Sequence, residues 1–176
     1  PDNKYYIMHD DIGTGYGNRN YGFGVCFYVG RSGSFQNTSY FAEEGIDITA
    51  PQYNNYGSSK VEVEIVDRIS SKIWNEKKQE VINTVNSMGV QLEEYQIDCL
   101  TDMRYQGWYI TASLQAYMQY GLNEGMVRAA SSGWSGNRGD ARWRLFSTGE
   151  YTTADGQIIQ ASNSTEENVD EENEND

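Results

Sequence analysis

The chain is poor in the residues from which disulfide frameworks and metal centres are built. It has 2 cysteines, 2 prolines and 1 histidine among 176 residues. Two cysteines do not make a disulfide framework. Because both lie in apolar segments, Cys26 and Cys99 are expected to be free thiols in the interior. One histidine and two isolated cysteines also argue against a structural zinc site, so we expect no metal.

Long hydrophobic runs and clusters of positive charge are missing too. No apolar run approaches the roughly 18 residues of a membrane span, and the sequence does not open with a signal peptide, so no membrane contact is expected. Lys and Arg number 13 against 26 Asp and Glu, which gives a net charge of −13. Without a basic stripe, binding to nucleic acid through its phosphates is disfavoured.

The negative charge is concentrated at the C-terminal end. Residues 147–176 hold nine acids and no base, whereas residues 1–146 carry a net charge of only −4. After Ile159 the chain consists mainly of Asn, Ser, Glu and Asp, a composition that cannot bury a core. We therefore expect residues 152–176 to be an acidic disordered tail or linker. Elsewhere, 38% hydrophobic and 13% aromatic residues suffice for one core.

The N-terminal third has a β pattern. Residues 4–29 are rich in Gly and Tyr, and short alternating stretches flank a glycine turn at residues 13–17. This pattern predicts a β-hairpin or a small meander. Residues 30–58 are polar and rich in turn formers, so we expect an irregular insertion with at most a short strand. Residues 1–58 are thus interpreted as a β lobe.

The hydrophobic period changes to that of a helix at Ser59. Apolar residues step by four from Val61 to Ile73, and Ser58 or Ser59 with Glu62 is typical of a capping box. The same spacing continues to Met88, and a glycine follows as a stop. Further helices are predicted over residues 92–103, over 110–118 with an end near Gly121, over 126–130, and over 138–146 with an end at Gly149. Residues 59–151 are therefore interpreted as a helical lobe, and the fold class as α+β with a cleft between the lobes.

Three segments together resemble a known family. The first is Tyr6-Ile7-Met8-His9-Asp10-Asp11, followed by a glycine turn and Asn20-Tyr21-Gly22-Phe23-Gly24-Val25. The second is Asp102-Met103-Arg104-Tyr105-Gln106-Gly107, and the third joins Trp134-x-x-Asn137-Arg138 to Leu145-Phe146-Ser147-Thr148-Gly149-Glu150-Tyr151. In this order they resemble the phage-type lysozymes, the muramidases of glycoside hydrolase family 24. The resemblance implies a lysozyme-like fold, a small β lobe packed on a mainly helical lobe.

The resemblance also implies a reaction, which is hydrolysis of the β-1,4 bond between N-acetylmuramic acid and N-acetylglucosamine in bacterial peptidoglycan, without cofactors. Glycosidic cleavage needs one carboxylic acid to protonate the leaving oxygen and a second carboxylate at the oxocarbenium face. Asp11 matches the family's catalytic Asp, and Asp10 is the second choice because the glycine turn is longer here. Asn20 matches the Thr with which many members position water. Both aspartates could instead be ordinary turn carboxylates beside Gly13.

Four residues of the helical lobe match positions around the family's cleft. Tyr105 and Gln106 could bind sugar or simply end a helix. Trp134 is either a cleft-wall aromatic or a core residue. Arg138 either forms a structural ion pair or contacts substrate.

The family's general acid has no obvious counterpart. It is a Glu in an N-terminal helix, yet residues 1–10 contain no Glu. We expect the acid upstream of Pro1, with Asp2 as the alternative. Glu43 and Glu44 are interpreted as solvated loop acids, although an insertion could overhang a cleft.

The missing acid, the start at Pro1 and the acidic tail suggest a piece of a larger, cleaved protein. The expectation is a phage tail-tip or virion-associated lysin that acts on the cell wall, either in the virion or outside the cell. Its partners would be peptidoglycan, an upstream segment of the same precursor and other phage tail proteins. A free endolysin is a close alternative. A catalytically inactive structural or glycan-binding tail component, and an unrelated acidic α+β interaction domain, are alternatives from other classes.

Overall fold

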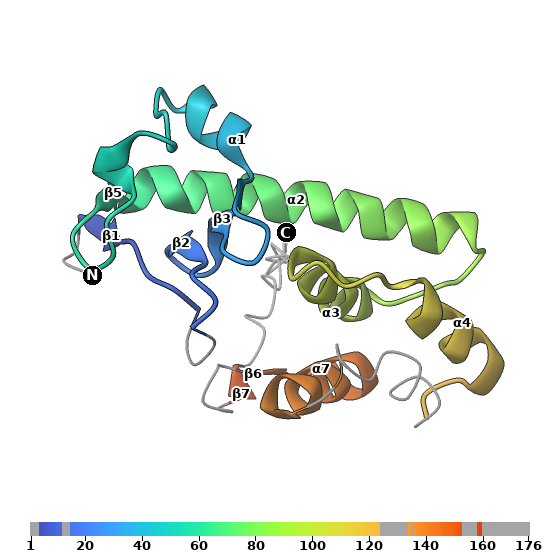
Figure 1. Ribbon diagram of the computed structural model, residues 1–176. Coiled ribbons are helices and arrows are strands. Elements are labelled where there is room, and N and C mark those ends of the chain that lie inside the picture. Colours follow the sequence, from blue (N-terminus) through green and yellow to red (C-terminus); the bar gives the residue numbers. More distant parts are fainter. Residues whose placement is uncertain (1–3, 12–14, 124–133, 135, 153–157, 160–176) are drawn as a thin grey trace, which may run out of the picture. The chain divides into compact units, whose positions relative to one another are not determined.

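The structure is a computed structural model, and it shows mixed α+β architecture with small antiparallel sheets, as the sequence predicted. It describes all residues except 1–3, 12–14, 124–133, 135, 153–157 and 160–176. The chain divides into two compact units, residues 1–79 and 80–176. Helix α2 (Val63–Ser87) is continuous and contributes to both units (Figure 1).

The first unit contains two small antiparallel sheets. β1 (Tyr5–Ile7) pairs with β5 (Lys60–Glu62), while β2 (Arg19–Tyr21), β3 (Val25–Val29) and β4 (Ser34–Phe35) form a three-stranded sheet. The hairpin predicted around the glycine turn at residues 13–17 is wrong, because β1 pairs with β5, and only a single bridge between His9 and Asn20 links the segment after β1 to β2. The hairpin of this sheet instead joins β2 to β3 through a turn at residues 22–24, within a stretch that was predicted as one strand.

The predicted start of the long helix is wrong by four residues. Residues 60–62 form β5, and α2 begins at Val63. Val61 is buried between exposed Lys60 and Glu62, a pattern that suits a strand as well as a helix, and pairing with β1 decides between them. Ser59 does not cap the helix, because its hydroxyl donates to the Gln52 carbonyl (2.7 Å). The end at Ser87 and the glycine stop agree with the prediction, since Gly89 has a φ of 67°.

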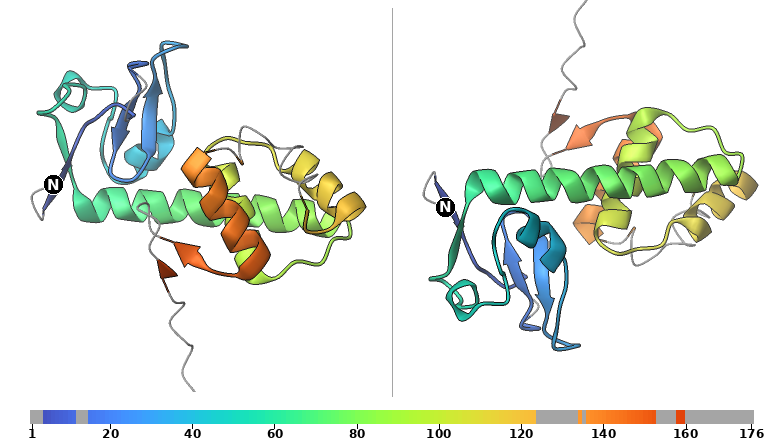
Figure 2. Two further views of the ribbon diagram at one scale, coloured as in Figure 1. Left: turned by 90° about the horizontal axis from the view of Figure 1, so that it is seen from below. Right: turned by 90° about the horizontal axis from the view of Figure 1, so that it is seen from above.

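The segment expected to be irregular is more regular than its composition indicated. Besides β4 it forms α1 (Thr38–Glu43) and a 3₁₀ turn, Pro51–Tyr53. Figure 2 shows α1 over one face of the three-stranded sheet. There Phe41 lies 5.9 Å from Phe27, which stacks on Tyr21 at 5.3 Å between ring centroids. All three rings have no exposed surface, so they form the core of this unit.

The second unit is helical. It contains α3 (Glu94–Tyr105), α4 (Thr111–Tyr120) and α7 (Gly136–Thr148), together with the end of α2. These three helices match the predicted ones to within a few residues. Their core is a single apolar cluster whose buried members are Val81, Val85, Cys99, Leu100, Met103, Ile110, Leu114, Ala116, Trp134 and Phe146.

Part of the range predicted to be a disordered tail is ordered. β6 (Tyr151–Thr152) pairs with β7 (Ile158–Ile159) in a small hairpin. The rest of the predicted tail, and the short helix predicted over 126–130, lie outside the described residues.

Both cysteines are free thiols, as expected. Cys99 is fully buried in the helical core, and Cys26 on β3 is only partly buried. Burial raises the pKa of both thiols.

Candidate functional site

Asp11 follows β1 and has both carboxylate oxygens bound by side-chain amides. Asn18 Nδ2 donates to Oδ2 at 2.7 Å, and Asn20 Nδ2 donates to Oδ1 at 3.0 Å. Asn20 lies on β2 with 1% of its surface exposed, whereas Asp11 is partly exposed. The sheet thus holds a partly exposed carboxylate in a defined orientation, as catalytic and binding groups require. The structure brings Asp11 and Asn20 into direct contact.

Asp10 has a different set of partners. Its Oδ1 accepts hydrogen bonds from the backbone N–H groups of Asp11 (2.8 Å) and Asn18 (3.0 Å), and its Oδ2 accepts one from Gly17 (2.9 Å). The Asp10 carboxylate thus joins the two ends of the loop that contains the glycine turn, residues 11–18, which we call the glycine loop. This geometry favours the interpretation of Asp10 as a turn carboxylate, which the sequence had left open beside a catalytic role.

The glycine loop is also fixed from the end of β3. Asn18 Oδ1 accepts a hydrogen bond from the Gly30 N–H at 3.0 Å, so one amide joins Asp11 to the end of this strand. Gly30 lies so close that an added Cβ would be 1.9 Å from the Tyr16 carbonyl oxygen. Only glycine fits this contact, and the contact in turn positions Asn18 beside Asp11.

Replacing Asp10 with Asn should mainly weaken folding. An amide can accept with only one of its two ends, so at least one charge-assisted bond to the loop is lost and an NH₂ group faces a backbone N–H. We expect the free energy of unfolding to fall by about 2 kcal/mol, measured by urea denaturation. An unchanged stability combined with loss of glycan hydrolysis would instead make Asp10 the catalytic carboxylate.

A β-bulge shapes the sheet face that carries Asp11. The register shifts between Arg19 and Asn20, so that Asn20 lies opposite Cys26 and Arg19 lies opposite Tyr28. The extra residue is Phe27 on β3, whereas β2 keeps its alternation, so the side chains of Arg19 and Asn20 point to opposite faces. The Arg19 guanidinium lies over the ring of Tyr28, its partner across the strands, at 4.1 Å. The Asp11 carboxylate adds to the effect of burial in raising the pKa of Cys26.

The matched residues of the second unit differ in exposure. Tyr105 is partly buried and Gln106 is exposed at the end of α3. Trp134 is only 3% exposed and donates from Nε1 to Ser113 Oγ at 3.3 Å. It offers no free ring face to a sugar, so its position favours the core interpretation. Arg138 is exposed in the first turn of α7.

Sequence reasoning missed Arg142. It is 4% exposed and donates from Nε to Asp102 Oδ2 at 2.8 Å, and it also donates to Gln106 Oε1. The structural ion pair that the sequence suggested for Arg138 is thus made by the arginine one turn further along. The spacing could have shown this, because Arg142 shares a buried face of α7 with Gly139 and Phe146.

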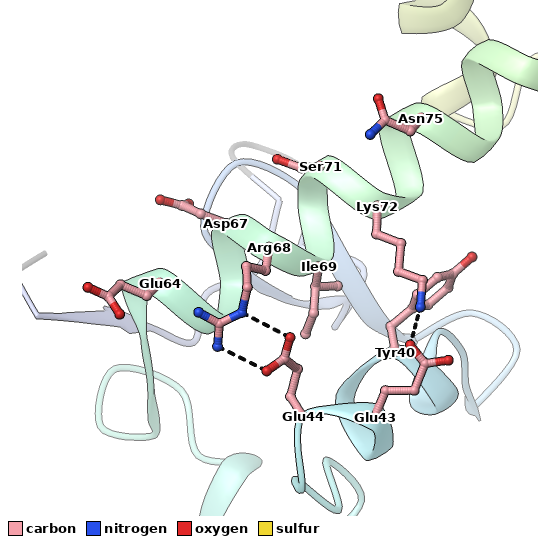
Figure 3. A pocket seen from close by; sticks show the side chains of 10 residues that line it. All are labelled: Tyr40, Glu43, Glu44, Glu64, Asp67, Arg68, Ile69, Ser71, Lys72 and Asn75. Atoms are coloured by element: carbon pink, nitrogen blue, oxygen red, sulfur yellow. Dashed lines mark hydrogen bonds and ion pairs between the residues drawn. The ribbon is translucent and has the colours of Figure 1, made fainter.

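A second feature of the first unit is a groove of about 750 Å³ between α1 and α2. Figure 3 shows that charged side chains face one another across it. Glu44 accepts two hydrogen bonds from Arg68, at 3.1 and 3.0 Å, and Glu43 pairs with Lys72. The hydrogen bonds from Arg68 lower the pKa of Glu44. A carboxyl group that stays ionised is a poor general acid, so Glu44 is unsuited to that role.

Within the residues that the structure describes, no group of three or more potential metal ligands occurs, and no helix is long and apolar enough to cross a membrane. Searches of protein-family models, of curated proteins and of solved structures found no match to this chain.

Proposed function

We propose that the chain belongs to a peptidoglycan-cleaving glycosidase in which Asp11 is the ionised carboxylate of the reaction. The observation that carries this proposal is the orientation of Asp11 by the Asn18 and Asn20 amides at 2.7 and 3.0 Å. The resemblance of the sequence to phage-type lysozymes indicates which bond is cleaved, the β-1,4 bond between N-acetylmuramic acid and N-acetylglucosamine. The proposed place of action is the bacterial cell wall, reached from a phage tail or from outside the cell.

In this reaction Asp11 stabilises the positive charge that develops on the sugar carbon or directs the attacking water. Asn20 keeps the carboxylate in place and can orient that water through its amide. The chemistry needs no cofactor, because proton transfer and charge stabilisation by side chains suffice.

The general acid must be a second carboxyl group. Asp10 is bound by three backbone N–H groups, and Glu43 and Glu44 are both ion-paired. Following the resemblance to phage-type lysozymes, the proposal assigns the acid to Asp2 or to a segment preceding Pro1.

The same observation favours a second candidate. Because Asp10, Glu43 and Glu44 are all committed to hydrogen bonds or ion pairs, the chain is also suited to be a non-catalytic glycan-binding component. It would then have the same sugar-facing surface without the proton donor.

The test is digestion of purified peptidoglycan by the chain alone and by the chain joined to the segment encoded before Pro1, with mass spectrometry of the products. We expect new reducing-end muramic acid from the extended chain and little from the chain alone. Binding to insoluble peptidoglycan without products from either form would support the second candidate. If neither form of the chain binds peptidoglycan or releases products, both candidates are contradicted.

A further inference from the structure

His9, the one histidine of the chain, has both ring nitrogens next to backbone carbonyl groups. Nδ1 lies 2.9 Å from the Asp10 carbonyl oxygen, and Nε2 lies 3.0 Å from the Gly22 carbonyl oxygen. The first carbonyl belongs to the peptide bond that leads into Asp11, and the second follows β2, the strand that carries Asn20. The ring therefore joins the two segments that bring Asp11 and Asn20 together.

These two contacts require a particular form of the imidazole ring. A carbonyl oxygen can only accept a hydrogen bond, so each ring nitrogen must carry a proton for both contacts to be hydrogen bonds. The neutral ring has one N–H group and one bare nitrogen, whereas the protonated ring donates from both nitrogens. In the neutral ring, one contact therefore places a nitrogen lone pair against a carbonyl oxygen. The geometry around His9 is that of the protonated ring.

Few backbone hydrogen bonds connect the Asp11 segment to β2. β1 pairs with β5, and among the described residues the backbone connection to β2 is the bridge between His9 and Asn20. In this bridge the His9 N–H donates to the Asn20 carbonyl at 3.1 Å, and the Asn20 N–H donates to the His9 carbonyl at 2.9 Å. The contact of Nε2 with Gly22 is a further link beside this bridge, and the contact of Nδ1 with Asp10 orients the ring for it.

The other titratable groups on the elements around His9 have partners of their own. On the same segment, Asp10 binds backbone N–H groups of the glycine loop, and Asp11 binds two side-chain amides. The groups on neighbouring elements that also have a partner are Tyr6 of β1, Arg19 and Tyr21 of β2, Tyr56, Lys60 of β5 and Asp67 of α2. His9 is exposed, so its ring exchanges protons with solvent, and histidine is the side chain that ordinarily changes charge between about pH 5 and pH 8.

We propose that His9 is a positioning residue whose protonated ring clamps the Asp11 segment to the end of β2. This inference rests on the proposed function, in which Asp11 must be held against Asn18 and Asn20. Because the folded chain favours the protonated ring, the clamp stabilises the site fully at acidic pH and is lost as the pH rises and the ring gives up a proton. His9 takes no part in bond cleavage and acts through the backbone that carries Asp11.

The first test is an NMR titration of the wild-type chain from about pH 5.5 to about pH 8. The ¹⁵N signals of the ring show which nitrogens carry protons, and their assignment is unambiguous because the chain has one histidine. When the ring gives up a proton, one of the two carbonyls loses its donor. The ¹³C signal of the Asp10 or the Gly22 carbonyl should therefore shift together with the ring signals. If both carbonyl signals stay unchanged while the ring titrates, the clamp is overturned.

The second test compares hydrogen exchange of the Asn20 backbone N–H in the wild type and in His9→Phe, which keeps an aromatic ring but has no N–H group. The protection of this N–H, corrected for its intrinsic exchange rate at each pH, should be about threefold greater at the acidic end in the wild type. His9→Phe should show the lower protection at both ends. The same pH dependence in His9→Phe would contradict the proposal. If this variant does not fold, the wild-type titration still decides.

Tyr56→Phe is the matched control for His9→Phe. The Tyr56 hydroxyl donates to the Asn18 carbonyl at 3.0 Å, so it is another bond from a side chain to the backbone of the glycine loop, and tyrosine does not ordinarily change charge in this pH range. The variant should lower the protection of Asn20 by the same factor at both ends and keep the wild-type pH dependence. If Tyr56→Phe removes the pH dependence as His9→Phe does, general loosening of the loop explains the effect and the proposal is wrong.

The third test links the clamp to hydrolysis, measured on the form of the chain that is active. The rate of peptidoglycan hydrolysis by the wild type, divided by the rate of His9→Phe, should be about threefold greater at the acidic end than at the basic end. A rate ratio that does not change with pH would overturn the positioning role of His9 and leave the proposed function intact. If NMR and exchange show the clamp but no form of the chain cleaves glycan, the clamp is supported and the proposed function is contradicted.

Discussion

Asp11→Asn should lower the rate of peptidoglycan hydrolysis by about 100-fold or more, measured on the form of the chain that is active. The substitution removes the negative charge that the oxocarbenium-like transition state requires. It also places an NH₂ group against the amide of Asn18 or Asn20, so we expect a modest loss of stability, about 1 kcal/mol. The two effects are separable, because hydrolysis can be measured well below the unfolding temperature of the variant.

Glu43→Gln is the control for Asp11→Asn. It removes an exposed carboxylate of the same unit, one that pairs with Lys72 at the α1–α2 groove. We expect this variant to retain nearly full activity, because surface ion pairs contribute little to stability. Full activity of Asp11→Asn together with loss in Glu43→Gln would move the catalytic centre to the groove.

The second large effect is expected from Gly30→Ala. The new Cβ would lie 1.9 Å from the Tyr16 carbonyl oxygen and 2.7 Å from the carbonyl carbon of Gly17. These are backbone atoms, so they cannot move aside as the end of a flexible side chain could. We expect a loss of about 3 kcal/mol in unfolding free energy. Any protein that still folds should lose activity, because Asn18 can no longer hold Asp11.

Gly45→Ala separates steric overlap from backbone strain. Gly45 has a φ of 77° with nothing within 4 Å of an added Cβ, whereas Gly30 would suffer overlap alone. We expect the control to lose about 1 kcal/mol, with unchanged activity. A smaller loss for Gly30→Ala than for Gly45→Ala, in thermal or urea unfolding, would contradict the close contact of the glycine loop with β3.

Local patterns were sufficient to predict most of the helical unit. The apolar spacing and the following glycines indicated α3, α4 and α7. Both signals lie within or next to the helical segment itself, so they can be found without knowing the tertiary contacts. The start of α2 could not be found in this way. Residues 60–62 become a strand only because they meet β1, more than fifty positions earlier in the chain.

The candidate site was predictable in part, for a similar reason. The sequence indicated Asp11 and Asn20, and their contact follows from the strand and turn that carry them. The separate role of Asp10 depends on backbone N–H groups of Gly17 and Asn18, whose direction no side-chain pattern reveals. The register between β2 and β3 depends on a bulge, which alternation alone does not predict.

The central claim, that the Asp11 carboxylate faces the glycan, can be tested directly by NMR. Soluble peptidoglycan fragments are titrated into the chain while the side-chain amide signals of Asn18 and Asn20 are followed. Because both amides donate to Asp11, sugar binding there should shift both signals in a saturable manner. Unchanged Asn18 and Asn20 signals at saturation, with shifts confined to residues of the α1–α2 groove, would contradict the account.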